Sequence, residues 1–196
     1  MPYSPKSVLL APTPPDAAAR AVRFIMARPH GEYTEVDIAG TIVPSYVAVC
    51  AGVGLDAVLL IAQMIHETGN LASWWAARPR RNPAGIGVTG RTQGAQPPTG
   101  IWQQRNGWWV EGIAFASWKD DAIPAHIGRL LAYAVTDAAA NDAQRQLIEY
   151  AMLIRPLPAS YRGVAPTITG LNGRWAVPGK DYGQRIATVA NRMLAG

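Results

Sequence analysis

The hydrophobic pattern of this chain is densest over residues 55–69, LDAVLLIAQMIHETG. Apolar residues at a helical period cover almost the whole circumference of this segment, so little of it can face solvent. We therefore predict a buried central helix around which the rest of the domain packs. Its polar residues Asp56, Gln63 and Glu67 share one narrow stripe of the helix surface. Gly69 directly after the pattern is typical of a helix C-cap.

Five further stretches have one-sided hydrophobic patterns that predict helices, each opened by residues that favour an N-cap or a first turn. The expected starts are Asp16, Thr41 with Pro44 after it, Asp120 or Asp121 with Pro124 after it, Asn141 or Asp142, and Asp181 with Gln184 as a capping box.

Glycine and proline recur throughout residues 70–100, which predicts a long loop without regular structure. A loop of this length in a compact domain is usually functional or disordered. Within it, NPAGIGV at residues 82–88 consists mostly of small residues that let the backbone approach a ligand closely.

Asn106-Gly107 lies between two aromatic, β-favouring runs and predicts a hairpin with a two-residue type I′ turn. This register pairs Arg105 with Trp108 and sets Trp102 opposite Glu111. Together, the elements predict a mainly helical domain, an α+β arrangement with one small β-hairpin.

The composition sets the size and class of the protein. With 196 residues, of which 49% are hydrophobic and 16% charged, the chain suffices for one well-cored globular domain. Residues 1–15 contain several prolines and predict an extended arm, which leaves residues 16–196 as a single domain. Cys50 is the single cysteine, so no intramolecular disulfide can form, and its apolar surroundings favour a buried thiol.

A net charge of +5 suggests an anionic partner: nucleic acid, a membrane surface or an acidic wall polymer. No nucleic-acid-binding motif accompanies the charge, and the Arg78, Arg80, Arg81 cluster is more often a solvated loop. The N-terminal residues lack the pattern of a signal peptide, and no segment looks long and apolar enough to span a membrane.

Glu67 has an unusual position for a carboxylic acid. Partial burial at the end of a buried helix and the negative end of the helix dipole both favour its protonated form. Such a group can donate a proton near neutral pH. The alternatives are a solvent-facing glutamate or one that is paired with an arginine.

Other catalytic motifs are absent from the sequence. His66-Glu67 lacks the second histidine that a zinc-binding HExxH motif requires, and no GxSxG, P-loop or dinucleotide fingerprint occurs. We expect no metal and no cofactor.

His126 lies on a predicted helix, where a hydrogen-bonded, half-buried histidine is expected. Among the seven tryptophans, Trp102, Trp108, Trp109 and Trp175 fall in hairpin or loop regions, where they could stack on sugar rings or pack locally.

Four segments resemble one family. Residues 62–69, AQMIHETG, resemble the AQxxxETG or AQxxxESG signature of the glucosaminidase domains of bacterial and phage autolysins, glycoside hydrolase family 73 in the lysozyme-like superfamily. NPAGIGV is similar to that family's NNLFGIK loop, FASWKDDAIPAHIGRLL to its FRxYxSxxxSxxDHxxxL segment, and WAVPGKDYGQRI to its YATDPNYADKI segment. The four occur in the family's order and span about residues 42–194.

The resemblance implies a lysozyme-like fold and cleavage of β-1,4 bonds in peptidoglycan on the N-acetylglucosamine side. Glu67 would be the catalytic acid. The substrate-binding residues implied around it are Gln63, Asn82, Gly85, Ile86, Trp102, Trp109, Trp175 and Tyr182. The chain departs from the pattern at Ala84, where the family has Phe, and at Pro178 or Gly179, where an acid is common.

The second catalytic group stays open. In the family it comes from a mobile hairpin, and Glu111 is the nearest candidate by place; the alternative is a surface strand glutamate. Asp120 and Asp121 fit helix caps better. The substrate's own acetamido group could replace a second carboxylate.

Three functions remain open: a glucosaminidase, a lytic transglycosylase or muramidase of the same fold, and a wall-binding module without activity. We expect peptidoglycan glycan strands as the partner, action on the bacterial cell wall as a monomer, and no nucleic acid or membrane insertion. The lack of a signal peptide favours a phage enzyme released at lysis.

Overall fold

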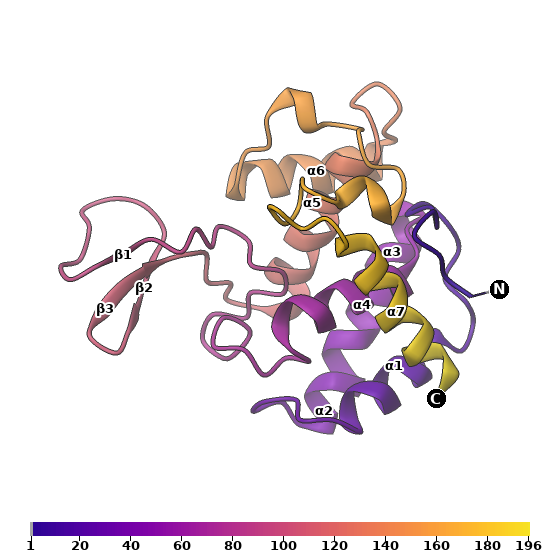
Figure 1. Ribbon diagram of the computed structural model, residues 1–196, viewed down its shortest axis with the longest axis horizontal. Helices are drawn as coiled ribbons and strands as arrows, with labels where there is room; N and C mark the ends of the chain where they lie inside the picture. The colour runs from indigo at the N-terminus through magenta and orange to yellow at the C-terminus, as the bar shows by residue number, and fades with distance from the viewer. Residues whose placement is uncertain (1) are drawn as a thin grey trace.

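A computed structural model describes residues 2–196 and consists of a helical body from which a small sheet projects (Figure 1). The helices of the body are α1 (Ala17–Met26), α2 (Glu35–Asp37), α3 (Val43–Val53), α4 (Ala57–Thr68), α5 (Ile123–Ala134), α6 (Asp142–Ile154) and α7 (Tyr182–Ala195). Two π-helical segments, Ile38–Ile42 and Trp118–Ala122, lead into α3 and α5, and two short 3-10 helices, Ala159–Tyr161 and Ile168–Leu171, precede α7.

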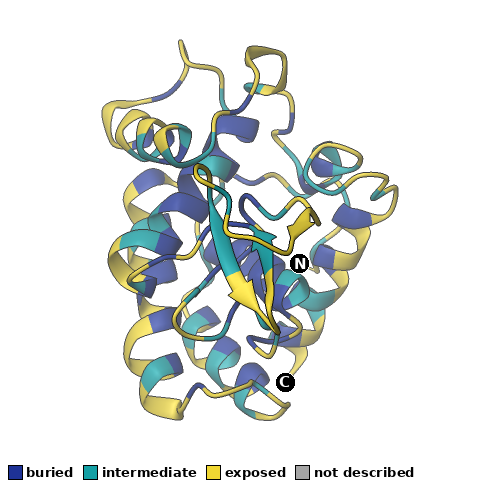
Figure 2. Cartoon of the chain, turned by 90° about the vertical axis from the view of Figure 1, so that its left-hand side faces the viewer, coloured by how far each residue is buried: buried dark blue, intermediate teal, exposed yellow. Residues whose placement is uncertain are grey.

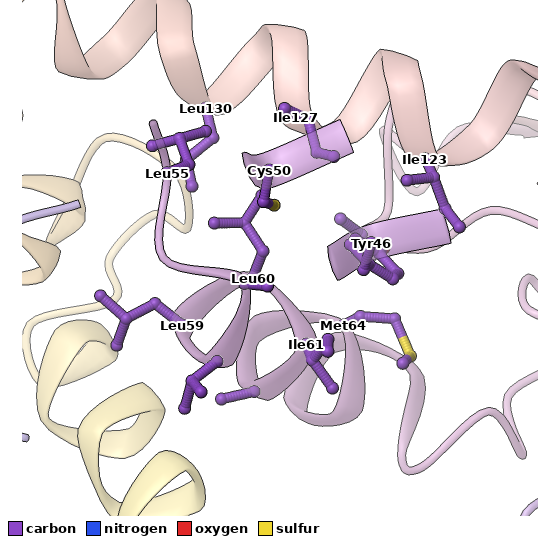
Figure 3. Packing of buried hydrophobic residues seen from close by; sticks show 14 of the residues in the cluster. Tyr46, Cys50, Leu55, Leu59, Leu60, Ile61, Met64, Ile123, Ile127 and Leu130 are labelled. Carbon is purple, nitrogen blue, oxygen red and sulfur yellow. The ribbon is translucent and has the colours of Figure 1, made fainter. Parts of the chain in front are cut away.

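The predicted central helix is confirmed as α4, which buries ten of its 12 residues. Asp56 is its N-cap and accepts a hydrogen bond from the Val58 amide at 2.9 Å, and Gly69 ends it in the left-handed conformation that a C-cap favours. Figure 3 shows Cys50 of α3 between Leu60 of α4 and Ile127 of α5. The sequence prediction of a buried thiol at Cys50 is therefore confirmed.

The second and third predicted helices start earlier than expected. Helical structure is continuous from Glu35 through Val53, because the Thr34 hydroxyl and the Asp37 carboxylate form a capping box that the hydrophobic pattern did not reveal. The predicted start near Thr41 was wrong. A π turn lies directly before Pro44, whose missing N–H suits a break in the regular hydrogen-bond ladder.

A side-chain cap and a π-helical segment also precede α5. The side chain of Ser117 caps the segment by accepting from the Asp120 amide at 3.1 Å, so Asp120 and Asp121 are not the caps expected from the sequence. The Asp121 carboxylate instead accepts from the Ser117 amide at 3.2 Å. A π turn again precedes the proline, Pro124, in the first turn of the following helix.

The other three helices start where predicted, but two of the expected caps differ. Asp16 is the N-cap residue of α1, although its side chain makes no cap hydrogen bond. Asn141 caps α6 in a capping box with Gln144. Helix α7 begins after Asp181, but the Asp181 side chain makes no cap hydrogen bond. The predicted capping box fails because Gln184 is used elsewhere: its Oε1 accepts from Asn172 at 3.1 Å.

The sheet contains the predicted hairpin and one strand more. Its order is β1 (Thr92–Gln93), β3 (Trp108–Glu111), β2 (Trp102–Arg105), all antiparallel. The pairs Trp102 with Glu111 and Arg105 with Trp108 are confirmed, and positive φ angles at Asn106 and Gly107 fit the type I′ turn. A two-residue strand such as β1 leaves no readable pattern in a sequence. Figure 2 shows the exposed outer part of this sheet facing the viewer.

The N-terminal residues 2–15 contain turns and bends and pack on the helical body. Leu9 is fully buried, and its amide donates to the Pro166 carbonyl at 2.9 Å. The Tyr3 hydroxyl donates to the Asp56 carboxylate at 2.5 Å, at the start of α4. The arm therefore fastens the first turn of the central helix, while the boundary between residues 1–15 and 16–196 stays a prediction.

One helical stretch meets the length and composition of a membrane span, contrary to the sequence expectation. Residues 35–53 form 19 consecutive helical residues with a mean hydropathy of 1.6. The stretch is longer than the helix expected from the sequence, because it also includes Glu35–Asp37 and the π-helical segment Ile38–Ile42. Ile38, Ile42 and Tyr46 of this stretch are fully buried in the core, and 39% of the stretch is buried inside the protein.

Helices α5 and α6 cross at Gly128, and this contact gives a test of the packing. A Cβ on Gly128 would lie 2.0 Å from the Leu147 carbonyl oxygen, a backbone atom that cannot move aside cheaply. We predict that Gly128→Ala lowers the free energy of unfolding by at least about 2 kcal/mol. Gly52→Ala is the matched control, because its Cβ meets nothing within 4 Å and helical alanine should stabilise α3 by up to about 1 kcal/mol. Urea unfolding of both variants measures this, and equal effects would contradict the packing.

Candidate active site

Glu67 lies on the last turn of α4 with its carboxyl half-buried. Its Oε1 accepts a hydrogen bond from the Tyr182 hydroxyl at 2.5 Å. Burial raises the pKa of Glu67, and the hydrogen bond from Tyr182, together with the influence of the Trp175 side chain, offsets only part of this rise. Within residues 2–196 no lysine, arginine or histidine forms a salt bridge with it. The structure thus has the unpaired, partly desolvated acid that the sequence predicted.

Glu67 is the end of a chain of hydrogen bonds that runs through the protein interior. Tyr182 accepts from Gln63 Nε2 at 2.8 Å, and Gln63 Oε1 contacts His126 Nε2 at 3.0 Å. On its other side, His126 Nδ1 contacts the Tyr46 hydroxyl at 2.8 Å. The chain therefore connects α3, α5, α4 and α7, in that order from Tyr46, and returns to α4 at Glu67.

The donors of this chain all point the same way. Because Gln63 Nε2 donates to Tyr182, its Oε1 must accept, which assigns the proton of His126 to Nε2 and makes Tyr46 the donor to Nδ1. Burial lowers the pKa of His126 to about 3, so the ring is neutral. Each donated proton lies on the side toward Glu67, and such an aligned chain stabilises negative charge at its accepting end.

The Glu67 carboxyl lines one pocket, and a second pocket begins at the neighbouring residue Gly85. The first, which we call the Lys180 pocket, has a volume of about 480 Å³ and is lined by Glu67, Tyr182 and a segment that includes Lys180 and Asp181. The second, the Gly85 pocket, measures about 210 Å³ and is lined by residues 84–88 together with Trp175, Tyr133 and three arginines. The carboxyl is therefore open to a ligand in the Lys180 pocket and lies beside the loop that lines the Gly85 pocket.

Gly85 of the Gly85 pocket lies beside the Glu67 carboxyl. Its φ of 62° is in the left-handed region that favours glycine, and a Cβ at this position would lie 3.9 Å from Glu67 Oε2. The buried Asn82 amide fixes this part of the loop: it donates to the Ile86 and Ile113 carbonyls and accepts from the Ile86 amide at 2.9 Å. The loop backbone therefore stands beside the acid, as the small residues of NPAGIGV indicated.

Five of the residues expected from the sequence come together here. Glu67, Gly85, Ile86, Trp175 and Tyr182 each line one of the two pockets.

Gln63 and Asn82 lie directly beneath this surface instead of on it. Both are buried, at about 1% exposed, and their amides are bonded to protein atoms. Their expected contact with substrate is therefore replaced by a supporting position: Gln63 holds Tyr182, and Asn82 holds the loop.

Glu111, Trp102 and Trp109 are not brought to Glu67. They lie on the projecting sheet, and neither pocket at Glu67 is lined by any of them. The Glu111 carboxylate accepts from the Thr89 hydroxyl and lies 3.4 Å from Arg91. The Trp102 indole donates to the Thr99 carbonyl at 3.0 Å.

Sequence reasoning missed several residues of the site. Asp181 lines the Lys180 pocket together with Glu67, but in the sequence it resembled a helix cap. Arg129, Arg155 and Arg174 line the Gly85 pocket from three separate elements, and no local motif joins them. His126 was expected to be half-buried and hydrogen-bonded; the hydrogen bonds are confirmed, but the ring is fully buried.

Across residues 2–196, no three His, Cys, Asp or Glu side chains lie close enough together to hold a metal ion.

The sequence matches no protein-family model and no curated protein. Among solved structures, the chain is similar to the crystal structure of the catalytic domain of the autolysin Auto from Listeria monocytogenes. The TM-score is 0.43 and the sequence identity is 17%, over 94% of this chain and 88% of that one. A likeness of this degree carries no argument about activity, which has to come from the site itself.

The raised pKa of Glu67 predicts how stability depends on pH. Below the pKa of an unfolded glutamate the group is neutral in both states, and above its higher folded pKa the buried charge opposes folding. We therefore expect Glu67→Gln to be more stable than the wild type at pH 7, with an advantage that shrinks as the pH falls to about 3.5. Thermal unfolding at both pH values measures this. An advantage that grows toward acid pH would show that the folded state lowers the pKa.

Proposed function

We propose that this protein cleaves the β-1,4 glycosidic bonds of peptidoglycan glycan strands, with Glu67 as the general acid. The observation that carries the proposal is the half-buried Glu67 carboxyl, which has a raised pKa and no salt bridge, lines the Lys180 pocket and lies beside Gly85 of the Gly85 pocket. The resemblance of AQMIHETG and three further segments to glucosaminidase domains supports the same residue. A net charge of +5 suits an anionic wall polymer.

In the proposed reaction, the sugar on one side of the bond occupies the Lys180 pocket and the next sugar lies toward the Gly85 pocket. The protonated Glu67 donates its proton to the glycosidic oxygen, and the bond from that oxygen to the anomeric carbon breaks. The aromatic ring of Trp175, which lines the Gly85 pocket, offers a flat surface for a sugar face. Cleavage on the N-acetylglucosamine side then leaves N-acetylglucosamine at the new reducing end.

The second half of the reaction is proposed to use the substrate's own acetamido group. Glu111 is engaged by Arg91 and Thr89 on the projecting sheet, which argues against it as the partner of Glu67 in this conformation. The acetamido oxygen attacks the anomeric carbon as the leaving oxygen is protonated, and water then opens the cyclic intermediate. Such substrate assistance is an established exception to the two-carboxylate scheme.

Lysis of purified cell walls tests the proposal. We predict that Glu67→Gln retains wall binding but loses at least about a hundredfold in rate, the scale of losing acid catalysis. Glu111→Gln is the matched control and should stay within about threefold of the wild type, because its carboxylate lines neither pocket. Equal lysis by Glu67→Gln and the wild type would remove Glu67 from the mechanism. An equal loss in both variants would instead make Glu111 the second carboxylate.

Mass spectrometry of the products separates the remaining alternatives. Reducing-end N-acetylglucosamine is the expected product. Reducing-end N-acetylmuramic acid would indicate a muramidase, and 1,6-anhydromuramic acid would indicate a lytic transglycosylase. Wall binding by the wild type without any product would indicate a binding module.

The Tyr182 hydrogen bond predicts a shift in the pH profile of this activity. Because Tyr182 donates to the ionised carboxylate, its loss should raise the pKa of Glu67 further. We expect the alkaline limb of kcat for Tyr182→Phe to move to higher pH. Tyr46→Phe, at the far end of the hydrogen-bond chain, is the control and should produce a smaller shift in the same direction. A limb that moves to lower pH in Tyr182→Phe would contradict the assigned donor.

A further inference from the structure

Three arginines converge on the Gly85 pocket from separate parts of the chain. Arg129 lies on α5, Arg155 directly follows α6, and Arg174 lies in the segment before α7. All three line a pocket of only about 210 Å³, together with Tyr133 and Trp175. Of the groups that line this pocket, none is acidic.

These arginines have no carboxylate partner among residues 2–196. No salt bridge joins any of them to an aspartate or glutamate. Arg129 donates to the Arg155 carbonyl and Arg174 to the Gly170 carbonyl, each at 3.0 Å, so backbone oxygens hold two of the guanidinium groups without neutralising them. The positive charge of the pocket is therefore left for a ligand to neutralise.

The environment of Arg129 makes this charge costly in the free protein. Its guanidinium carbon lies 5.8 Å from the centre of the Tyr133 ring and 5.9 Å from that of Trp175, so aromatic rings replace much of its water. Burial, and to a smaller degree the nearby Arg155, lower the pKa of Arg129. Converging like charges in a partly desolvated pocket are typical of sites for planar anions, which arginine binds with paired hydrogen bonds.

We infer that the Gly85 pocket binds a carboxylate carried by the glycan strand, on the lactyl side arm of a muramic acid residue. The inference rests on the proposed function for the identity of the strand. The pocket is next to the scissile position, because Gly85, which lines the pocket, lies beside the Glu67 carboxyl. N-acetylglucosamine has no acidic group, so this pocket selects peptidoglycan strands over chitin.

The carboxylate has two chemical sources on such a strand. In strands without stem peptides, the lactyl group itself ends in a free carboxylate. In intact strands this group is an amide, and the acidic groups of the attached peptide are the nearest carboxylates. Both sources present the same planar anion to the arginines.

Binding of defined strands to the Glu67→Gln protein tests the inference without cleavage. Calorimetry compares strands stripped of peptides with the same strands after methyl-amidation of the lactyl carboxylates. We predict at least about tenfold tighter binding of the carboxylate form, and a loss of most of this ratio in Arg155→Gln and in Arg174→Gln, as expected for one charge-assisted hydrogen bond. Arg192→Gln, an exposed arginine on the last turn of α7, is the control for net charge and should keep the ratio.

Intact strands, before and after methyl-amidation of their peptide carboxylates, identify the source. A ratio seen only with intact strands assigns the pocket to the stem peptide, and one seen with stripped strands assigns it to the lactyl group. Equal binding of both forms in every pair, or equal loss of the ratio in Arg192→Gln, would overturn the inference. Failure of the proposed function is read separately, as the absence of strand cleavage by the wild type.

Discussion

The hydrogen bond from Tyr182 to Glu67 joins the end of the central helix to the start of the last one. Helix α4 is almost completely buried, and Glu67 lies on its last turn. There the carboxyl meets the first residue of α7, Tyr182. Behind the bond, Gln63, His126 and Tyr46 continue the chain into the core, where Gln63 and His126 each have a hydrogen-bond partner on both sides. The orientation of the acid thus follows from the packing of four helices and not from a flexible loop.

Two opposing influences act on the same carboxyl. Desolvation favours the protonated acid, and the aligned donors of the chain favour the carboxylate. Desolvation is the larger, which leaves an acid able to donate its proton and then keep the resulting charge in place. This balance is what a general acid requires, since a group that is too stable in either form cannot complete a proton transfer.

The sequence predicted much of this arrangement where local chemistry decides the structure. The bounds of α4, the hairpin register at Asn106-Gly107 and the position of Glu67 all follow from short-range patterns. Prediction from the sequence failed where the deciding contact joins distant residues or leaves only a weak pattern in the sequence. Ser117 starts its helix about one turn before the predicted start and Thr34 about two turns before it, because the hydroxyl of each residue caps backbone amides ahead of the hydrophobic pattern.

The residues of the candidate site also fall into two groups, those predictable from local sequence and those brought together by tertiary packing. Glu67, Gly85 and Trp175 belong to motifs that can be read locally, whereas the arginines of the Gly85 pocket come together only after α5, α6 and the segment before α7 have packed. Glu111 shows the reverse error: its place along the sequence suggested the site, but the sheet that carries it projects from the helical body (Figure 1). Sequence order therefore predicted the acid and the loop beside it, and tertiary packing decided what surrounds them.

The most direct measurement is the titration of the Glu67 side-chain carboxyl by ¹³C NMR, with Glu67→Gln used to assign the resonance. The account predicts a midpoint clearly above that of a glutamic acid in a short unstructured peptide, which is about 4.3. A midpoint at or below the peptide value would show that the carboxyl is solvated or held as an anion, and would contradict its role as the proton donor.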